Sequence, residues 1–154
     1  MSRSIRLTLG VMAIFALAFG SVASTTAGGP KLLDARMTGI PTAGLSLHGL
    51  AGGGVPWTLE DGRAMLFTDG RLHVEVEGLV LATTGTNPVA NGRAVVTCSS
   101  AAVASSPVVP FSVPGGDAEV DTVVSLPASC LAPAVFFVGV LQSGAERWFA
   151  VTGS

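Results

Sequence analysis

Residues 65–77 read MLFTDGRLHVEVE, and this stretch decides the fold class. Two runs in which apolar and polar residues alternate flank the pair Asp69-Gly70. An Asp-Gly pair between alternating runs is a strong signal for a β-hairpin, because glycine adopts the positive φ that a tight turn requires. The stretch therefore predicts two antiparallel strands joined at Asp69-Gly70.

The length of the turn decides which side chains of this hairpin face the core. With a two-residue turn, one face holds an apolar set, namely Met65, Phe67, Leu72, Val74 and Val76. With a three-residue loop that contains a glycine bulge, the first strand shifts by one residue and the second strand keeps its face. The sequence predicts the face of the second strand and leaves that of the first open.

Further short strands are predicted at residues 79–82, 93–99, 108–113, 118–126, 134–141 and 147–152. Short strands at this spacing, in a chain with 20 Gly and 9 Pro, are typical of antiparallel sandwiches and barrels. We predict an all-β fold: a single antiparallel β-sandwich of Ig-like or Greek-key type over residues 56–154. Residues 28–55 are predicted to be a Gly/Pro-rich leader with room for a short edge strand near residues 45–48.

The first 27 residues have the pattern of a secretory signal peptide. A short positive lead with Arg3 and Arg6 precedes an apolar run from Leu7 to about Val22, and small residues follow up to Ala27. This order predicts a signal helix with cleavage near Ala27 or Ser24, and therefore a secreted or extracytoplasmic protein. The alternative is an uncleaved segment that holds the protein at the cell envelope.

The chain has two cysteines, Cys98 and Cys130. In an oxidising compartment a pair of cysteines in a small domain predicts a disulfide. Two free thiols are the alternative. Half of a metal site is less well supported, since no histidine or further cysteine lies close by in the sequence.

Charge argues against nucleic acid as a partner. Without residues 1–27 the chain has six basic against ten acidic residues, a net charge of −4, and it has a single lysine, Lys31. Binding to phosphates requires a basic cluster, and none is present. After residue 27 no apolar run reaches the length of a membrane span.

Candidate catalytic residues are few. Ser46 lies in GLSLH, which resembles a nucleophile elbow only at its first three positions. The two histidines, His48 and His73, together with scattered acids do not assemble a nucleophile, a base and an oxyanion donor. A small secreted hydrolase or metal-dependent enzyme is therefore the alternative and not the favoured function, and no cofactor is predicted.

Two groups of residues are candidates for ligand binding. Asp117, Glu119 and Asp121 alternate along one predicted strand, and clustered carboxylates are ligands that calcium prefers. A solvated strand face explains the same pattern and is favoured over calcium. Trp57 and Trp148 are the aromatic candidates, and the neighbours Trp148 and Phe149 point to opposite faces, so that one ring is either exposed or covered by a loop.

Several motifs resemble those of a group of small secreted bacterial proteins to which no activity is attached. They are GTNP (residues 85–88), DGR (61–63), LHVEVEGLVL (72–81), LPASCLAP (126–133) and WFAVTG (148–153). The resemblance implies a secreted single domain with paired cysteines. We predict from the residues a non-enzymatic extracytoplasmic binding or structural module whose partner is an unidentified extracellular or envelope component.

Overall fold

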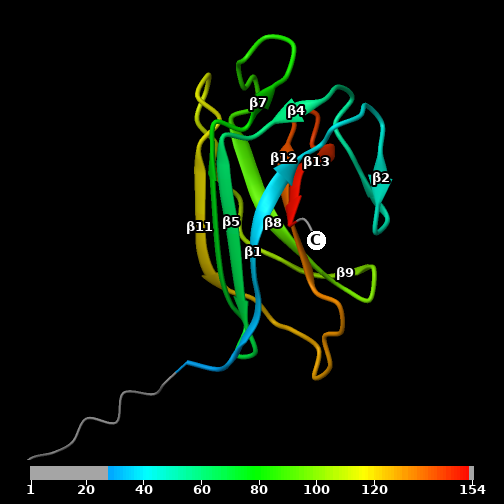
Figure 1. The fold of residues 1–154 in the computed structure, drawn as a ribbon, viewed down its shortest axis with the longest axis vertical. Helices are drawn as coiled ribbons and strands as arrows, with labels where there is room; N and C mark the ends of the chain where they lie inside the picture. The colour runs from blue at the N-terminus through cyan, green and yellow to red at the C-terminus, as the bar shows by residue number, and fades with distance from the viewer. Residues whose placement is uncertain (1–27, 153–154) are drawn as a thin grey trace, which may run out of the picture.

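Thirteen strands and no α-helix lie within residues 28–152, the residues that the structure, a computed structural model, describes (Figure 1). The strands are β1 (Lys31–Gly39), β2 (Ser46–Leu47), β3 (Leu50–Ala51), β4 (Trp57–Thr58), β5 (Asp61–Phe67), β6 (Arg71–Glu77), β7 (Val80–Leu81), β8 (Asn91–Cys98), β9 (Ala101–Ser105), β10 (Val109–Pro110), β11 (Ala118–Val123), β12 (Ala134–Val140) and β13 (Glu146–Thr152). The predicted signal helix and its cleavage site lie outside the described residues.

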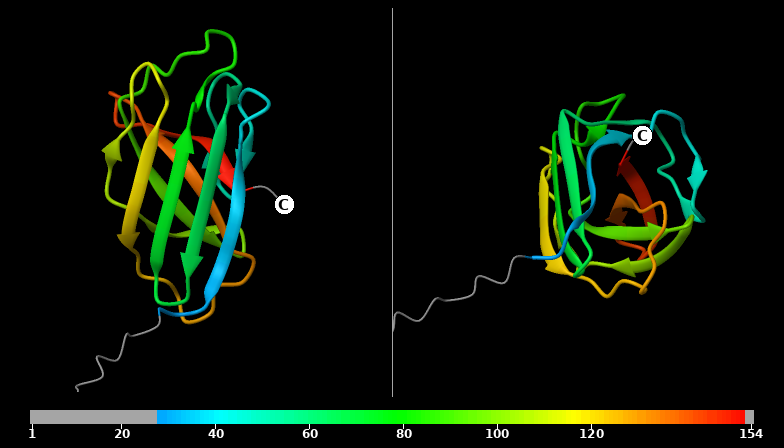
Figure 2. Two further views of the ribbon diagram at one scale, coloured as in Figure 1. Left: turned by 60° about the vertical axis from the view of Figure 1, so that its left-hand side comes forward. Right: turned by 60° about the horizontal axis from the view of Figure 1, so that its bottom comes forward.

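The main sheet curls into two layers that share strand β1 (Figure 2). In the first layer the order is β1-β5-β6-β11, and in the second it is β10-β8-β12-β13-β1. The first part of β1 pairs with β5, and residues Met37, Thr38 and Gly39 pair with β13. All strand pairs of this sheet are antiparallel.

The chain crosses between the layers three times. It passes from β6 to β8, returns from β10 to β11 beside β6, and crosses again to β12 beside β8. Strands that are adjacent in space are therefore often distant in sequence, as in Greek-key sandwiches. The predicted all-β antiparallel sandwich is confirmed.

The hairpin β5–β6 has the three-residue loop. Leu66 lies opposite Leu72, and Ala64 opposite Val74. The Gly70 N–H donates to the Phe67 carbonyl at 3.0 Å, and Gly70 has a φ of +87°, which is the geometry of a turn followed by a glycine bulge. The predicted inward face of β6 is confirmed, whereas on β5 the buried residues are Gly62, Ala64 and Leu66.

An aromatic cluster fills the core at the end of the sandwich near β4. Trp57 stacks on Phe149 with ring centroids 3.8 Å apart, and Phe111 packs edge to face on Phe137. The second layer is buried on its other side as well, since every residue of β12 from Val135 to Gly139 is buried. A strand that is covered on both sides has no place for charged side chains in water, and β12 carries none.

The hairpin β2–β3 covers this second side. The Gly53 N–H donates to the Trp148 carbonyl at 3.0 Å, and Gly52 forms an isolated bridge with Trp148. The His48 ring packs edge to face on Phe136, whose ring in turn packs against that of Trp148. The outward ring of Trp148 is therefore covered by a hairpin.

The predicted leader at residues 28–55 is wrong in its main part. Residues 31–39 form β1, which links the two layers, so the sandwich begins well before residue 56. From Leu33 onward β1 alternates between core and solvent, with Met37 and Gly39 buried. The predicted short strand near residues 45–48 is present as β2.

The predicted disulfide is present. Cys98 ends β8, and Cys130 lies in the connection from β11 to β12, with Cα atoms 5.0 Å apart. The bridge ties that connection to the sheet beside the hydrogen bond from the Ser99 N–H to the Leu131 carbonyl.

Candidate functional site

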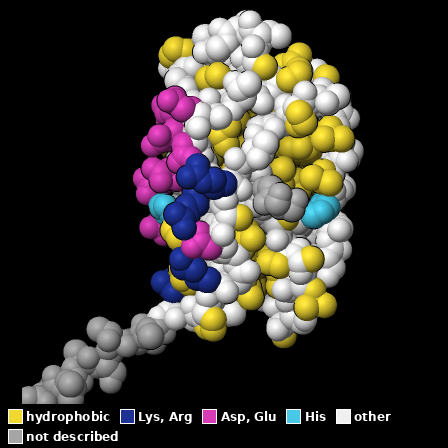
Figure 3. Space-filling model, viewed as in Figure 1, with side chains coloured by type: hydrophobic (Ala, Val, Ile, Leu, Met, Phe, Trp, Pro, Cys, Tyr) yellow, Lys and Arg dark blue, Asp and Glu magenta, His cyan; other side chains and the backbone are white. Residues whose placement is uncertain are grey.

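The charged side chains of the molecule gather on the outer side of the first layer. We call this surface the charged face: the outward residues of β1, β5, β6 and β11 together with the turns at their ends. Of all charged residues in 28–152, only Arg93, Glu146 and Arg147 lie elsewhere. Figure 3 shows the side chains of Asp, Glu, Lys and Arg together on one side of the view, and the other side shows none of them.

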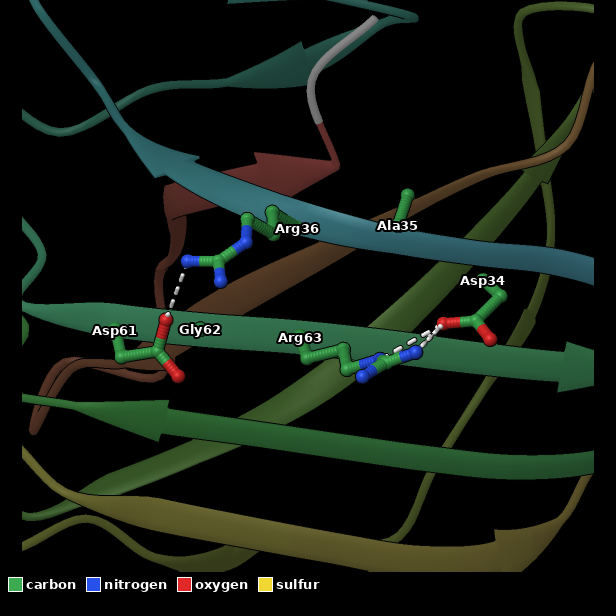
Figure 4. A pocket seen from close by; sticks show the side chains of 6 residues that line it. All are labelled: Asp34, Ala35, Arg36, Asp61, Gly62 and Arg63. Carbon is green, nitrogen blue, oxygen red and sulfur yellow. Dashed lines mark hydrogen bonds and ion pairs between the residues drawn. The ribbon is translucent and has the colours of Figure 1, made fainter.

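Alternation along four antiparallel strands arranges these side chains in rows across the sheet. Arg36 on β1 lies directly opposite Arg63 on β5. The two arginines do not contact each other, and each pairs diagonally with an aspartate of the other strand (Figure 4). Arg36 Nη1 lies 3.2 Å from Asp61 Oδ1, and Arg63 Nη2 lies 2.6 Å from Asp34 Oδ1. Lys31 adds a third contact, 2.7 Å from Asp34 Oδ2.

Two aspartates of the charged face are held in the ionised form. Hydrogen bonds from Lys31 and Arg63 lower the pKa of Asp34. The backbone N–H of Gly29, and then the backbone and side chain of Arg71, lower the pKa of Asp69. Because Gly29 precedes β1, Asp69 also ties the start of the described chain to the β5–β6 turn.

These pKa values predict how stability depends on acid. Both carboxyls have a lower pKa in the folded chain, so their stabilisation is complete above the ordinary value of 3.8 and is lost as the pH falls through the lowered values. We expect the variant Asp34→Asn/Asp69→Asn to lose less stability than the wild type between pH 5 and pH 2, in urea unfolding at each pH.

Asp121→Asn serves as the control, because it changes the charge at a position with no ion pair within residues 28–152. An acid dependence that is the same in the double variant as in the wild type would contradict the assignment.

The other half of the charged face is acidic. Arg63 lies opposite Glu75 across β5 and β6, but its guanidinium pairs with Asp34 instead. Glu75 on β6 lies directly opposite Glu119 on β11. Together with Glu60, Glu77 and Asp117 they line a groove of about 570 Å³ at the β6–β11 edge. Within residues 28–152 none of these five carboxylates is part of a salt bridge. The face thus divides into a paired half and an unpaired acidic half.

The calcium candidates are not gathered into a site. Asp117 accepts hydrogen bonds from the Gly78 N–H at 2.9 Å and from the Ser112 hydroxyl at 2.9 Å, so its carboxylate holds two loops in place. Glu119 and Asp121 project from β11, opposite Glu75 and His73. Among the described residues no group of three or more acids, histidines or cysteines is arranged to hold a metal ion.

The structure separates the candidate catalytic residues. The Ser46 hydroxyl donates to the Leu50 carbonyl at 3.2 Å, within the hairpin β2–β3. His48 lies in the turn of the same hairpin, with its Nδ1 2.8 Å from the Thr97 hydroxyl. His73 lies on the charged face between Met65 and Asp121. The two histidines therefore lie far from each other: Figure 3 shows one among the charged side chains and the other on the opposite side of the view.

Both tryptophans are buried, which corrects their assignment as ligand-binding candidates. Trp57 is 4% exposed and Trp148 1% exposed, and each packs on aromatic neighbours. The GTNP motif also has a structural role, because the buried Asn87 side chain donates to the carbonyls of Val89 and Ser112.

Residues 28–152 contain no helix long and apolar enough to cross a membrane. Comparisons with known protein families, with curated proteins and with solved structures found no match to this chain. The resemblance of the motifs to secreted bacterial proteins therefore stays a prediction.

Proposed function

We propose that this chain is a non-enzymatic binding module that acts outside the cytoplasm and holds a cationic partner on the acidic half of its charged face. The observation that carries the proposal is the groove of about 570 Å³ lined by five carboxylates, none of which forms a salt bridge within residues 28–152. The arginines and the lysine of the same face are already engaged with Asp34, Asp61 and Asp69.

The electrostatics of the groove favours a cationic partner. Opposed carboxylates such as Glu75 and Glu119 repel one another across a strand pair, which costs folding energy. A cationic group placed between them removes the repulsion, and a surface of one sign attracts partners of the opposite sign. Within residues 28–152 the charged residues of the second layer outside β1 are only Arg93, Glu146 and Arg147, and the hairpin β2–β3 covers its outer side at Trp148.

Location outside the cytoplasm is supported by two features. A disulfide-bonded β-fold is compatible with an extracytoplasmic place of work, since reducing compartments do not maintain such bonds. The pattern of residues 1–27 predicts the export signal that this location requires, with removal near Ala27 or Ser24. Catalysis is not proposed, because Ser46 and His48 have other partners and lie apart from the charged face.

The groove predicts selective binding of a cationic probe. We expect a fluorescent oligo-arginine peptide to bind the wild-type protein at low salt, and an oligo-glutamate peptide not to bind. The variant Glu75→Gln/Glu119→Gln is expected to weaken oligo-arginine binding about tenfold, equal to about 1.4 kcal/mol, because two central charges of the groove are removed. Fluorescence anisotropy measures both affinities.

A matched variant separates the groove from net charge. Thr42→Lys/Gln142→Lys also changes the net charge by two units, at exposed positions outside the charged face. We expect this control to retain most of the wild-type affinity, and pull-downs from culture and envelope fractions to follow the same order. Equal weakening in both variants would show that the groove is not the site.

A further inference from the structure

Strand β9 is an open edge of the main sheet. It pairs with β8 along one side, and no strand within residues 28–152 pairs with its other side. Apart from Ala104, each of its five residues is exposed. Figure 1 shows β9 at the rim of the fold, on the opposite side of the view from β11. An edge of this kind presents backbone N–H and C=O groups that a further strand can pair with.

The two edges of the sheet differ in their protection. Edge strand β11 carries Glu119 and Asp121 and begins next to Asp117, and charged side chains on an edge oppose pairing with other strands. Strand β9 has the sequence AAVAS, with neither a charge nor a proline. No charged residue occurs anywhere between Arg93 and Asp117. A β-bulge and a short length also protect an edge from pairing, and β9 has both: a bulge at Val103 and only five residues.

We propose that β9 pairs antiparallel with β9 of a second copy of this chain and joins two sandwiches into one continuous sheet. Pairing about a twofold axis places the same residues of both copies near one another. Only an uncharged edge permits this, because like charges directly opposite are unfavourable. A β11–β11 pair would bring Glu119 and Asp121 of two copies together, so charge selects β9 for self-pairing.

The size of the edge determines the strength of the contact. Five residues bury little area, and the bulge at Val103 interrupts the regular pairing with β8. Small interfaces of this kind give weak association. We therefore expect a dimer that forms as the protein concentration rises. The dimer is independent of the proposed cationic ligand, since β9 contributes nothing to the acidic groove.

Sedimentation velocity over a wide range of concentrations tests the proposal on the protein without residues 1–27. We expect a monomer–dimer equilibrium in the wild type. Val103→Lys, at a side chain 38% exposed, should weaken the dimer about tenfold or more, because one substitution places two like charges at the contact. Val55→Lys makes the same change at a side chain 41% exposed and outside β9, and should leave the dimer intact.

Ala101→Glu provides a second test at an exposed position of β9 with the opposite charge. Thermal unfolding of each variant confirms that it is folded. A protein that stays monomeric at every concentration overturns the proposal. Binding of an extended peptide of another sequence to β9 would not rescue it. A dimer that neither β9 variant weakens overturns it as well.

Discussion

Replacing Cys98 and Cys130 together by alanine is expected to lower the free energy of unfolding by about 4 kcal/mol. The disulfide closes a long loop, with a sequence separation of 32 residues, and so restricts the unfolded chain. On the chain-entropy relation a loop of this length corresponds to roughly 3–4 kcal/mol, and the loss of the buried Cys98 side chain adds to it. Urea unfolding of the wild type and the double variant measures the difference.

Reduction of the wild type separates the two contributions. A reduced protein keeps both sulfur atoms and loses only the covalent link, so it should lose slightly less stability than the double variant. Thiol titration of the denatured, unreduced protein isolated from outside the cytoplasm should find no free thiol. Two free thiols, or a stability unchanged by reduction, would show that the bridge has no part in the working protein.

The two layers differ in whether their outer side is open to water, and this difference bears on the proposed function. In the second layer, β12 lies between the core and the hairpin β2–β3 and is apolar on both sides, and charged residues are few on its neighbours β8 and β13. The first layer has the core on one side and water on the other, so each of its strands alternates between core and polar residues. Nearly all charge therefore falls on a single open face, which is where a partner can be met.

The sequence predicted the strands that alternate clearly and missed those that do not. Strand β6 and most strands after residue 79 were found, because each has an apolar face or a short β-branched run. Strand β9 was missed because Ala101–Ser105 has no alternation and few β-branched residues. Strand β1 carries a readable pattern from Leu33 onward, which the glycines and prolines around it obscured.

The charged face could be predicted only in part. The alternation of Glu75 and Glu77, or of Glu119 and Asp121, indicated solvated strand faces. Their assembly into one groove depends on β11 lying beside β6, although strands β7 to β10 lie between them in the chain. The pairing of Arg36 with Asp61 likewise depends on the register of β1 against β5. Neither register is encoded in local sequence.

Leu66→Ala is expected to lower the free energy of unfolding by roughly 2–5 kcal/mol, whereas Met65→Ala should lower it by less than about 1 kcal/mol. The three-residue loop turns Leu66 into the core, where it is 0% exposed, and leaves Met65 half-buried on the charged face. Removing a buried side chain costs both its transfer from water and the cavity that it leaves. A two-residue turn at Asp69-Gly70 would reverse the order of the two effects.

Leu72→Ala completes the comparison. Leu72 faces the core with either turn, so its substitution should cost about as much as that of Leu66 and calibrates the core. Urea unfolding measures all three variants. Equal m-values would show that the variants differ in stability and not in the surface that unfolding exposes. If Met65→Ala proved the more costly of the two, Gly70 would not form the bulge that its contact with the Phe67 carbonyl indicates, and every outward residue of β5 would change sides.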